Sequence, residues 1–360
     1  MGKTYVAILA GGRGERLWPK SRVVCPKQNL RIIGKRSIVE DAVRRAKRIA
    51  SGNVFIVTNK ESIGNAPRDV RRMGKRRLIV EPFGRNTAPA IGLAALLAHR
   101  EDRDAVLVAM PSDHIVLDNK RFYRSIGIAV KEARDRRAII TMGIKPDSPR
   151  SSYGYIGVVD KVYKIPADSS YKVLRFVEKP TVGKAKAMLK SNRFLWNSGI
   201  FVFKTSVLLD ALRIHVPRLY RGLNSLPDIR EKRIFDKRLN TLYKNIEGDS
   251  LDYALMERYS NTRVVPSDFG WSDVGSFDSL YAILPKDKRG NAVLGSCATI
   301  DTENCLIYST EKTMTGAIGL NNLAIVISED AVLVCDRRRT EDVKLLVKRL
   351  KGNIEHQKFL

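Results

Sequence analysis

Short apolar runs alternate with amphipathic segments along residues 5–142. The apolar runs have the length of buried strands, whereas the segments between them repeat apolar residues every three or four positions. Strands are predicted at Tyr5–Ala10, Asn53–Thr58, Arg77–Glu81, Ala105–Met110 and Ala138–Met142, and helices after Ser37 and at Ala90–His99 and Arg121–Arg136. This alternation predicts an α/β fold with a mainly parallel sheet and helices on both of its faces.

The pattern changes after residue 142. Runs rich in β-branched and aromatic residues predict strands that begin at Tyr153 and span Lys172–Val177, Ile200–Phe203 and Thr262–Val265. Residues 205–243 read as a peripheral helical region. Two short amphipathic helices are predicted at Ser250–Glu257 and Phe277–Leu284.

A domain boundary is predicted near the segment Pro285–Gly290. Beyond it, short strands at Ala298–Ile300, Cys305–Tyr308, Leu323–Ile327 and Val332–Cys335 precede a final amphipathic helix, Glu341–Leu350. Their spacing is typical of a small β-solenoid-like domain rather than of more parallel α/β sheet. We therefore expect one domain at residues 1–285 and a second at residues 286–360.

The first predicted strand runs into a glycine loop, Gly11-Gly12-Arg13-Gly14. Exposed N–H groups on such a loop, with a helix starting behind it, favour an anion. Arg13, Arg16 and Lys27 add positive charge, which predicts a phosphate cradle. The dinucleotide fingerprint does not fit, because Leu17 stands where its third glycine belongs, and the P-loop ending is absent. The glycines alone leave open a tight turn that binds nothing.

Two aspartates are candidate ligands. Asp113 follows the apolar strand Ala105–Met110, at the edge where open α/β sheets bind ligands. Asp273 lies in a Gly- and Ser-rich turn before a helix. As isolated residues, each is equally a candidate helix cap or turn residue. The same alternative applies to Asn86 and Thr87, because both stand at the start of the helix that contains Ala90–His99.

Composition narrows the class of protein. The 360 residues are 44% hydrophobic and 29% charged, which describes a soluble globular chain. No apolar run approaches the roughly 20 residues that span a bilayer, and no signal peptide is recognised, so we expect a cytoplasmic protein without a membrane partner. The four cysteines lack metal-type spacing and are expected to be reduced thiols. The four histidines are dispersed, which argues against a histidine metal centre.

The net charge of +27 attracts polyanions. However, the basic residues are spread along the chain, and no basic stripe is interleaved with the aromatic residues that stack single-stranded bases. We therefore interpret the charge as a solvated basic surface and do not expect a nucleic-acid partner. The positive field also suits anionic nucleotide and sugar-phosphate substrates.

Several motifs together resemble one family. GGRGERLWPKS followed by PKQ, then EPFGRNTAPAIG, PSDH, the segments around Tyr153–Gly157 and Trp196–Gly199, and SLDYALME occur here in the family's order. They resemble the sugar-nucleotide pyrophosphorylases, in the mannose-1-phosphate guanylyltransferase branch. The resemblance implies a Rossmann-like, GT-A-like nucleotidyltransferase domain followed by a β-helix-like domain. It also implies Mg²⁺-dependent attack of mannose 1-phosphate on the α-phosphate of GTP, and a homodimer.

The resemblance further assigns roles to residues. Catalysis is expected from Arg16, Lys27, Asp113 and Asp273, with both aspartates as Mg²⁺ ligands. Nucleotide binding is expected from Gly11, Gly12, Arg13, Gly14, Asn86, Thr87, Pro89 and Ser112. Sugar-phosphate binding is expected from Gly154, Glu178, Lys179, Asn197 and Asp252. In this scheme Glu178 accepts from sugar hydroxyls and Lys179 meets the phosphate of the sugar.

Two other functions fit part of these features. The same fold could act on glucose 1-phosphate with UTP or dTTP, although the Asn86–Pro89 and Trp196–Gly199 segments argue against it. A non-catalytic member that binds nucleic acid would use the basic surface, although the intact candidate residues argue against a decayed site. One residue departs from the pattern, because Asn29 follows Pro-Lys-Gln where an aromatic residue is usual.

Overall fold

A computed structural model describes residues 2–11, 14–74, 77–310 and 312–360. Its large mixed sheet has the strand order β3-β2-β1-β4-β10-β6-β11-β8, and β7 joins it through β10 and carries β9. The strands are β1 (Thr4–Ala10), β2 (Val54–Asn59), β3 (Leu78–Glu81), β4 (Val106–Pro111), β6 (Ile139–Ile144), β7 (Tyr155–Gly157), β8 (Tyr171–Lys172), β9 (Arg175–Val177), β10 (Phe194–Lys204) and β11 (Thr262–Ser267). Strands β3, β2, β1 and β4 are parallel, whereas β10 runs antiparallel to both β4 and β6.

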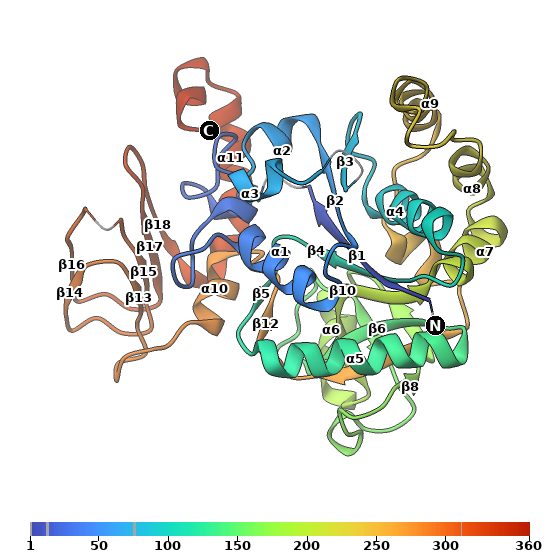
Figure 1. Ribbon diagram of the computed structural model, residues 1–360. Coiled ribbons are helices and arrows are strands. Elements are labelled where there is room, and N and C mark those ends of the chain that lie inside the picture. The colour runs from blue at the N-terminus through green and yellow to red at the C-terminus, as the bar shows by residue number, and fades with distance from the viewer. Residues whose placement is uncertain (1, 12–13, 75–76, 311) are drawn as a thin grey trace.

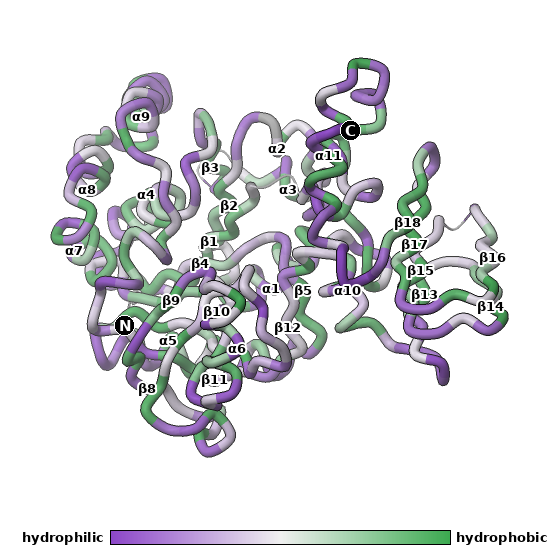
Figure 2. The backbone as a smooth tube through the Cα atoms, turned by 180° about the vertical axis from the view of Figure 1, so that it is seen from behind, coloured by the Kyte–Doolittle hydropathy of each residue, from purple (hydrophilic) through white to green (hydrophobic). Residues whose placement is uncertain are grey.

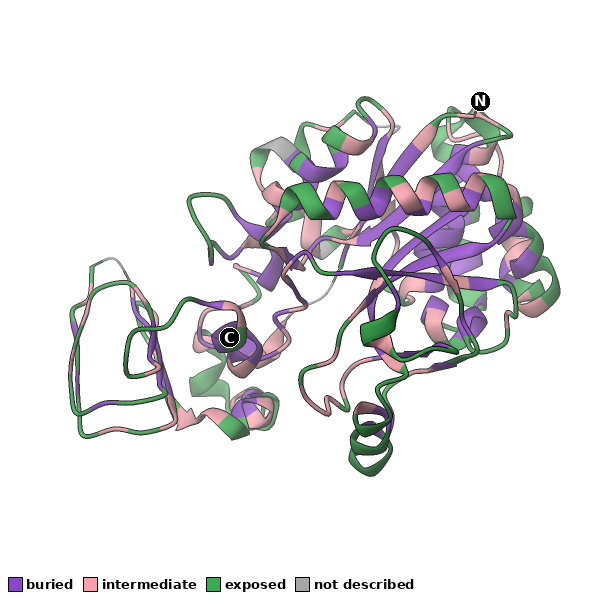
Figure 3. Ribbon diagram, turned by 90° about the horizontal axis from the view of Figure 1, so that it is seen from below, coloured by how far each residue is buried: buried purple, intermediate pink, exposed green. Residues whose placement is uncertain are grey.

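Alternate residues of the central strands enter two different cores. In β1, Tyr5 and Ala7 pack on one face of the sheet, while Val6 and Ile8 pack on the other. This is the two-residue period of a strand that is buried on both faces. The central strands are accordingly hydrophobic along their length in Figure 2 and buried in Figure 3.

Helices cover both faces of this sheet, as the sequence predicts (Figure 1). One face carries α4 (Thr87–Glu101), α7 (Thr205–His215), α8 (Pro217–Asn224) and α9 (Lys232–Asn245), and the other carries α1 (Ile38–Ile49), α3 (Arg68–Arg71), α5 (Asn119–Arg136) and α6 (Val182–Ser191). The short α2 (Lys60–Gly64) follows β2. A capping box fixes the start of α1, because the Ser37 side chain accepts from the Glu40 N–H and the Glu40 side chain accepts from the Ser37 N–H.

Two local predictions are wrong. The loop after Gly14 leads into a single 3₁₀ turn, η1 (Glu15–Leu17), and not into a helix, so it lacks the helix dipole expected there. The predicted strand Lys172–Val177 is two short strands with different partners, since β8 pairs with β11 and β9 pairs with β7. The short helix predicted at Ser250–Glu257 is present, mainly as a π-helical turn, η4 (Asp252–Met256).

Residues after 290 form the β-solenoid-like unit that the sequence predicts. Strands β13 (Ala292–Leu294), β15 (Leu306–Tyr308) and β17 (Leu323–Ile327) are parallel, β18 (Val332–Asp336) closes that sheet antiparallel, and β14 (Cys297–Ile300) pairs in parallel with β16 (Thr315–Ile318). Cys305 and Ile307 point into the solenoid, whereas Leu306 and Tyr308 join a third core with α10 (Phe277–Ile283) and α11 (Val343–Lys351). The prediction missed β13 and β16, which are short.

Within the described ranges, no helix is long and apolar enough to cross a membrane. All four cysteines are free thiols, as predicted.

Candidate active site

A cavity of about 190 Å³ opens at the carboxyl ends of β1 and β4, where Leu9 and Pro111 lie. Open α/β sheets bind ligands at this edge. The cavity brings together predicted residues from distant parts of the chain, namely Thr87, Gly154, Glu178, Asn197, Asp252 and Asp273. Aromatic and apolar side chains, including Phe201 and Trp271, complete its wall.

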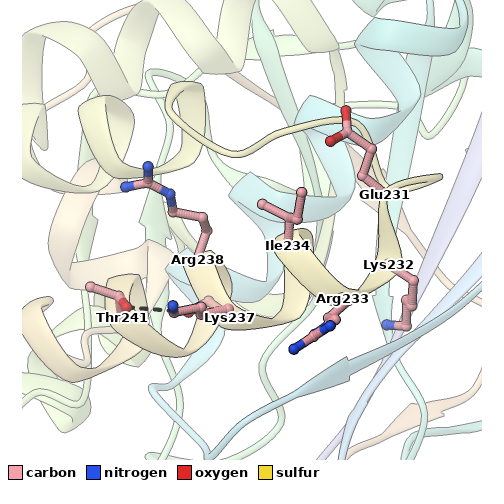
Figure 4. A pocket seen from close by; sticks show the side chains of 7 residues that line it. All are labelled: Glu231, Lys232, Arg233, Ile234, Lys237, Arg238 and Thr241. Atoms are coloured by element: carbon pink, nitrogen blue, oxygen red, sulfur yellow. Dashed lines mark hydrogen bonds between the residues drawn. The ribbon is translucent and has the colours of Figure 1, made fainter.

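A larger surface hollow of about 910 Å³ lies over α9 and is a different feature (Figure 4). Basic side chains such as Lys232, Arg233 and Arg238 line it, and no predicted site residue does. We place the candidate site in the smaller cavity, because that cavity holds carboxylates, an amide and buried walls at the ligand-binding edge of the sheet.

Lys27 links the two predicted metal ligands. Its Nζ donates to Asp113 Oδ2 at 2.7 Å and also to the backbone carbonyl of Asp273. Lys27 is only 7% exposed, so its ammonium is held in place and partly shielded from water. The fold therefore assembles one positive and two negative groups from three separate segments.

Side chains from two other elements hold the loop that carries Asp113. Trp271, in β12 (Trp271–Ser272), donates its Nε1 to His114 Nδ1 at 3.1 Å, and the buried Arg45 of α1 donates to the His114 carbonyl at 3.2 Å. Burial alone would raise the pKa of Asp113, but Lys27 and His114 outweigh it, and the pKa is lowered. Burial lowers the pKa of His114, so its ring is neutral at pH 7.

Asp273 sits in a strained turn. Its Oδ1 accepts from the Tyr153 hydroxyl at 2.7 Å and from the Gly275 N–H at 3.0 Å. The next residue, Val274, is fully buried and has φ 46°, a left-handed conformation that a β-branched residue rarely adopts. Such strain costs on the order of 1–3 kcal/mol and is typical of functional turns. The surrounding core holds Val274 in this conformation and thereby fixes the Asp273 carboxylate.

The glycine loop requires Gly14 for two reasons. Its φ is 63°, and a Cβ on Gly14 would lie 2.4 Å from the Cβ of Lys27. Gly14 therefore lets the chain turn while Lys27 packs against it. Gly11 is exposed and has open space around it. The predicted residues Gly12 and Arg13 lie outside the described residues.

Four more residues are predicted to bind the nucleotide, and each has a structural place in the fold: Asn86, Thr87, Pro89 and Ser112. Asn86 has φ 66° and caps α4, since its Oδ1 accepts from the Thr87 N–H at 2.9 Å. Thr87 faces the cavity and its hydroxyl accepts from the Leu251 N–H at 3.0 Å. Pro89 is buried in the first turn of α4, and Ser112 is 1% exposed directly after β4. Of these four residues, the structure brings only Thr87 into the cavity wall.

The predicted sugar-binding residues do converge. Asn197 Nδ2 donates to Asp252 Oδ1 at 2.8 Å, and Lys179 Nζ lies 2.6 Å from Glu178 Oε1. A Cβ on Gly154 would lie 2.4 Å from Glu178 Oε2, so a side chain at that position would displace this carboxylate. Lys179 also has a positive φ, of 43°.

The raised pKa of Asp252 should make the stability of the protein depend on pH in a way that can be measured. Burial and then the charge of Glu178 raise the pKa of Asp252 from 3.8 to about 7. A carboxyl whose pKa is higher in the folded than in the unfolded chain stabilises the fold at low pH, and this contribution is lost as the pH rises toward the folded value. We expect Asp252→Asn, which keeps an acceptor for Asn197, to reduce the fall in Tm between pH 5 and pH 8.

The measurement is thermal unfolding of both proteins across that pH range. Glu247→Gln, an exposed residue on the preceding segment, serves as the control and is expected to leave the pH profile unchanged. Parallel Tm profiles for wild type and Asp252→Asn would contradict the raised pKa.

Asp113 and Asp273 are the residues that could hold a divalent cation. They are two carboxylates on separate elements, and a Lys27 ammonium already bridges their segments, so the place between them favours positive charge. Mg²⁺ typically binds to one or two carboxylates and takes its other ligands from water and substrate phosphates. In the described part of the chain, no group of three or more His, Cys, Asp or Glu side chains forms a complete protein site. The residues therefore fit a cation that arrives with a phosphate substrate.

Sequence reasoning missed the residues that orient the aspartates. Tyr153 was predicted only as the start of a strand, yet its hydroxyl holds Asp273, and burial followed by the Asp273 charge raises its pKa well above the usual value. Trp271 and Arg45 act in the same way on the Asp113 loop. The aromatic residues at Tyr153 and Trp271, each beside a glycine, were the available signal.

Comparisons with known proteins identify the family of this chain. The sequence model of the nucleotidyl transferase family matches residues 5–290, and that of the MannoseP isomerase/GMP-like beta-helix domain matches residues 295–350. A mannose-1-phosphate guanylyltransferase of Klebsiella pneumoniae is 38% identical over 353 residues, covering 96% of this chain and 74% of that protein. One from Escherichia coli, also 38% identical, has the same coverage. The chain thus spans about three quarters of the length of these relatives.

Among solved structures, the chain is similar to one titled mannose-1-phosphate geranyltransferase, from Thermus thermophilus. The TM-score is 0.86 at 29% identity, and the match covers 97% of this chain and 99% of that one. Because the sequence matches and this fold agree over nearly the whole chain, it belongs to the nucleotidyl transferase family and, within it, to the mannose-1-phosphate guanylyltransferases.

Proposed function

We propose that this enzyme joins mannose 1-phosphate to GTP and releases pyrophosphate. A phosphate oxygen of mannose 1-phosphate forms a bond to the α-phosphorus of GTP, and the bond from that phosphorus to the oxygen of the leaving pyrophosphate breaks. The products are GDP-mannose and pyrophosphate. The nucleophile is already an anion at pH 7, so the reaction needs no general base.

The barrier is mainly electrostatic, because two polyanions must meet in line. Two unit charges 4 Å apart repel by about 4 kcal/mol at an effective dielectric constant of 20. Fixed positive charge in the site offsets this repulsion. We assign that role to Lys27, which contacts both aspartate segments, and to Arg16 and Lys179.

We assign Asp113 and Asp273 as ligands of a divalent cation, with Mg²⁺ as the metal. When bound, such a cation neutralises phosphate charge and polarises the phosphoryl oxygens. The Tyr153 and Gly275 donors to Asp273 and the Lys27 donor to Asp113 leave acceptor capacity on both carboxylates. These contacts orient the two groups before substrate arrives.

The observation that carries the proposal is the convergence of two different sets of groups on one cavity edge. The Lys27, Asp113 and Asp273 set suits phosphates, and the Glu178, Asn197 and Asp252 set offers acceptors and an amide for sugar hydroxyls. Thr87, which is predicted to bind the nucleotide, is linked to the second set because its hydroxyl accepts from the N–H of Leu251, the residue before Asp252. The relatives' names supply the identities of the base and the sugar.

The test is pyrophosphate release with Mg²⁺ over a grid of GTP, UTP, dTTP, ATP and CTP against mannose 1-phosphate and glucose 1-phosphate. We expect the maximum at GTP with mannose 1-phosphate. A maximum at UTP or dTTP with glucose 1-phosphate would keep the reaction type but reject this specificity. No release with any pair would reject the proposed function.

Three further properties complete the proposal. We propose a cytoplasmic enzyme, in line with its four free thiols. We propose a homodimer, and size-exclusion chromatography with light scattering tests it. We also propose that residues 1–285 and 286–360 are the two domains, which limited proteolysis near residue 290 tests.

A further inference from the structure

The segment that follows the glycine loop rests on the last part of the chain. Trp18 Nε1 donates to the Phe359 carbonyl at 2.7 Å, and the Val23 N–H donates to the Leu360 carbonyl at 3.2 Å. Glu15 forms an ion pair with Lys351. In Figure 1, α11 accordingly stands beside the blue N-terminal segment, which is far from it in sequence.

Apolar packing reinforces these bonds. Leu17 and Trp18 are 1% and 7% exposed, and they share one core with Val343 and Val347 of α11. Burying such side chains stabilises this arrangement because it removes apolar surface from water. The loop after Gly14 is therefore positioned by residues more than 300 positions away, and not by a helix of its own.

One short turn contacts two segments at once, the one that carries Arg16 and the helix that follows Asp273. This turn, η5 (Arg337–Asp342), places Glu341 Oε2 3.0 Å from Arg16 Nε. Its first residue, Arg337, lies 3.1 Å from Asp278 and stacks its guanidinium 3.6 Å above the Tyr281 ring, both on α10. Helix α10 begins four residues after Asp273.

We propose that the η5 turn is a clasp that positions Arg16 for the nucleotide triphosphate, with Glu341 as its positioning residue. The ion pair engages Nε of the guanidinium, and the other N–H groups of this five-donor fork can donate to phosphate oxygens. The clasp also sets the distance from Arg16 to the turn that carries Asp273. This inference rests on the proposed function in one respect, namely that the triphosphate binds beside Arg16.

The clasp acts on one substrate only. The sugar side is built from β7, β9, β10 and η4, and in the described residues these elements form no hydrogen bond or ion pair with residues 337–360. Loss of the clasp should therefore weaken nucleotide binding and leave sugar-phosphate binding unchanged. A general loss of stability would weaken both.

The test compares Glu341→Ala with Asp342→Ala in the same turn. Both changes remove one negative charge, but Asp342 pairs with the exposed Arg339 and makes no side-chain cap for α11. We expect Glu341→Ala to raise KM for GTP about 2- to 5-fold, the range of an exposed ion pair, at unchanged KM for mannose 1-phosphate. Asp342→Ala should match wild type in both constants. In an Arg16→Lys background, Glu341→Ala should add little, because its partner group is already altered.

A second readout does not depend on turnover. Hydrogen exchange of the amides at residues 15–22 should be several-fold faster in Glu341→Ala and in Trp18→Phe, which keeps an aromatic ring but loses the bond to Phe359. Ile354→Ser, an 85% exposed residue of the same tail, should exchange like wild type. Unchanged exchange in both variants, or equal rises in both KM values, would overturn the clasp. If no sugar nucleotide is formed by wild type, the exchange result still decides the clasp separately.

Discussion

Asp113→Ala and Asp273→Ala are each expected to lower kcat by about 10²–10³-fold while the protein stays folded. In the proposed function each carboxylate holds positive charge at the point where phosphate charge must be neutralised, and loss of one such preorganised group typically has an effect of this size. Asp113 keeps 30% of its side chain exposed, so its loss leaves room for water rather than an unfilled apolar core. The measurement is initial-rate kinetics with GTP and mannose 1-phosphate at saturating Mg²⁺, together with Tm.

The matched control is Asp268→Asn, which removes a negative charge five residues before Asp273. Asp268 is 85% exposed and pairs with Arg121 at the surface, so its removal should change kcat by less than about twofold. If Asp113→Ala and Asp273→Ala keep near-normal turnover, the two aspartates are turn residues and the metal assignment is wrong. If they lose turnover and Tm together, the carboxylates serve mainly to hold the fold.

Lys27→Met is expected to lose both activity and stability. The methionine keeps most of the buried stem but leaves Asp113 Oδ2 and the Asp273 carbonyl without their donor. Charged hydrogen bonds of this kind contribute about 1.5–3 kcal/mol, so we expect a loss of a few kcal/mol in the free energy of unfolding. We expect kcat to fall about 10²-fold or more, because the fixed cation between the aspartates is gone.

Lys27→Met should also change how Tm depends on pH, and the direction of this change follows from the lowered pKa of Asp113. Because Lys27 contributes to the lowered pKa of Asp113, the ionised carboxylate stabilises the fold above the usual aspartate range, and that contribution is lost as the pH falls. In Lys27→Met, the loss of Tm on acidification should therefore be smaller than in wild type. Lys35→Met, an exposed lysine, controls for the change in net charge. Equal acid sensitivity in Lys27→Met and Lys35→Met would show that Lys27 does not hold Asp113.

The periodicity of the chain was sufficient to predict its layers. Continuous apolar runs such as Ala105–Met110 can be satisfied only by burial on both faces, and β4 is buried accordingly. Amphipathic spacing predicted α1 and α5 for the same reason, since one helix face must leave water. The strand prediction failed where the segments were short, as at β8 and β9, because so few residues have too weak a local preference to outweigh their tertiary contacts.

The sequence by itself determined which residue types were available for phosphate, sugar and metal. Only the tertiary structure decided which of them meet. Lys27 reaches Asp113 and Asp273, and Asn197 reaches Asp252, because strand order and loop packing bring distant segments together. The glycine loop gave no sign that Arg16 and Trp18 would rest on residues beyond 337, since contacts across more than 300 positions leave no local pattern in either segment. Sequence periodicity reports the burial of one element, whereas a site depends on the relative placement of several, which the packing of their cores fixes.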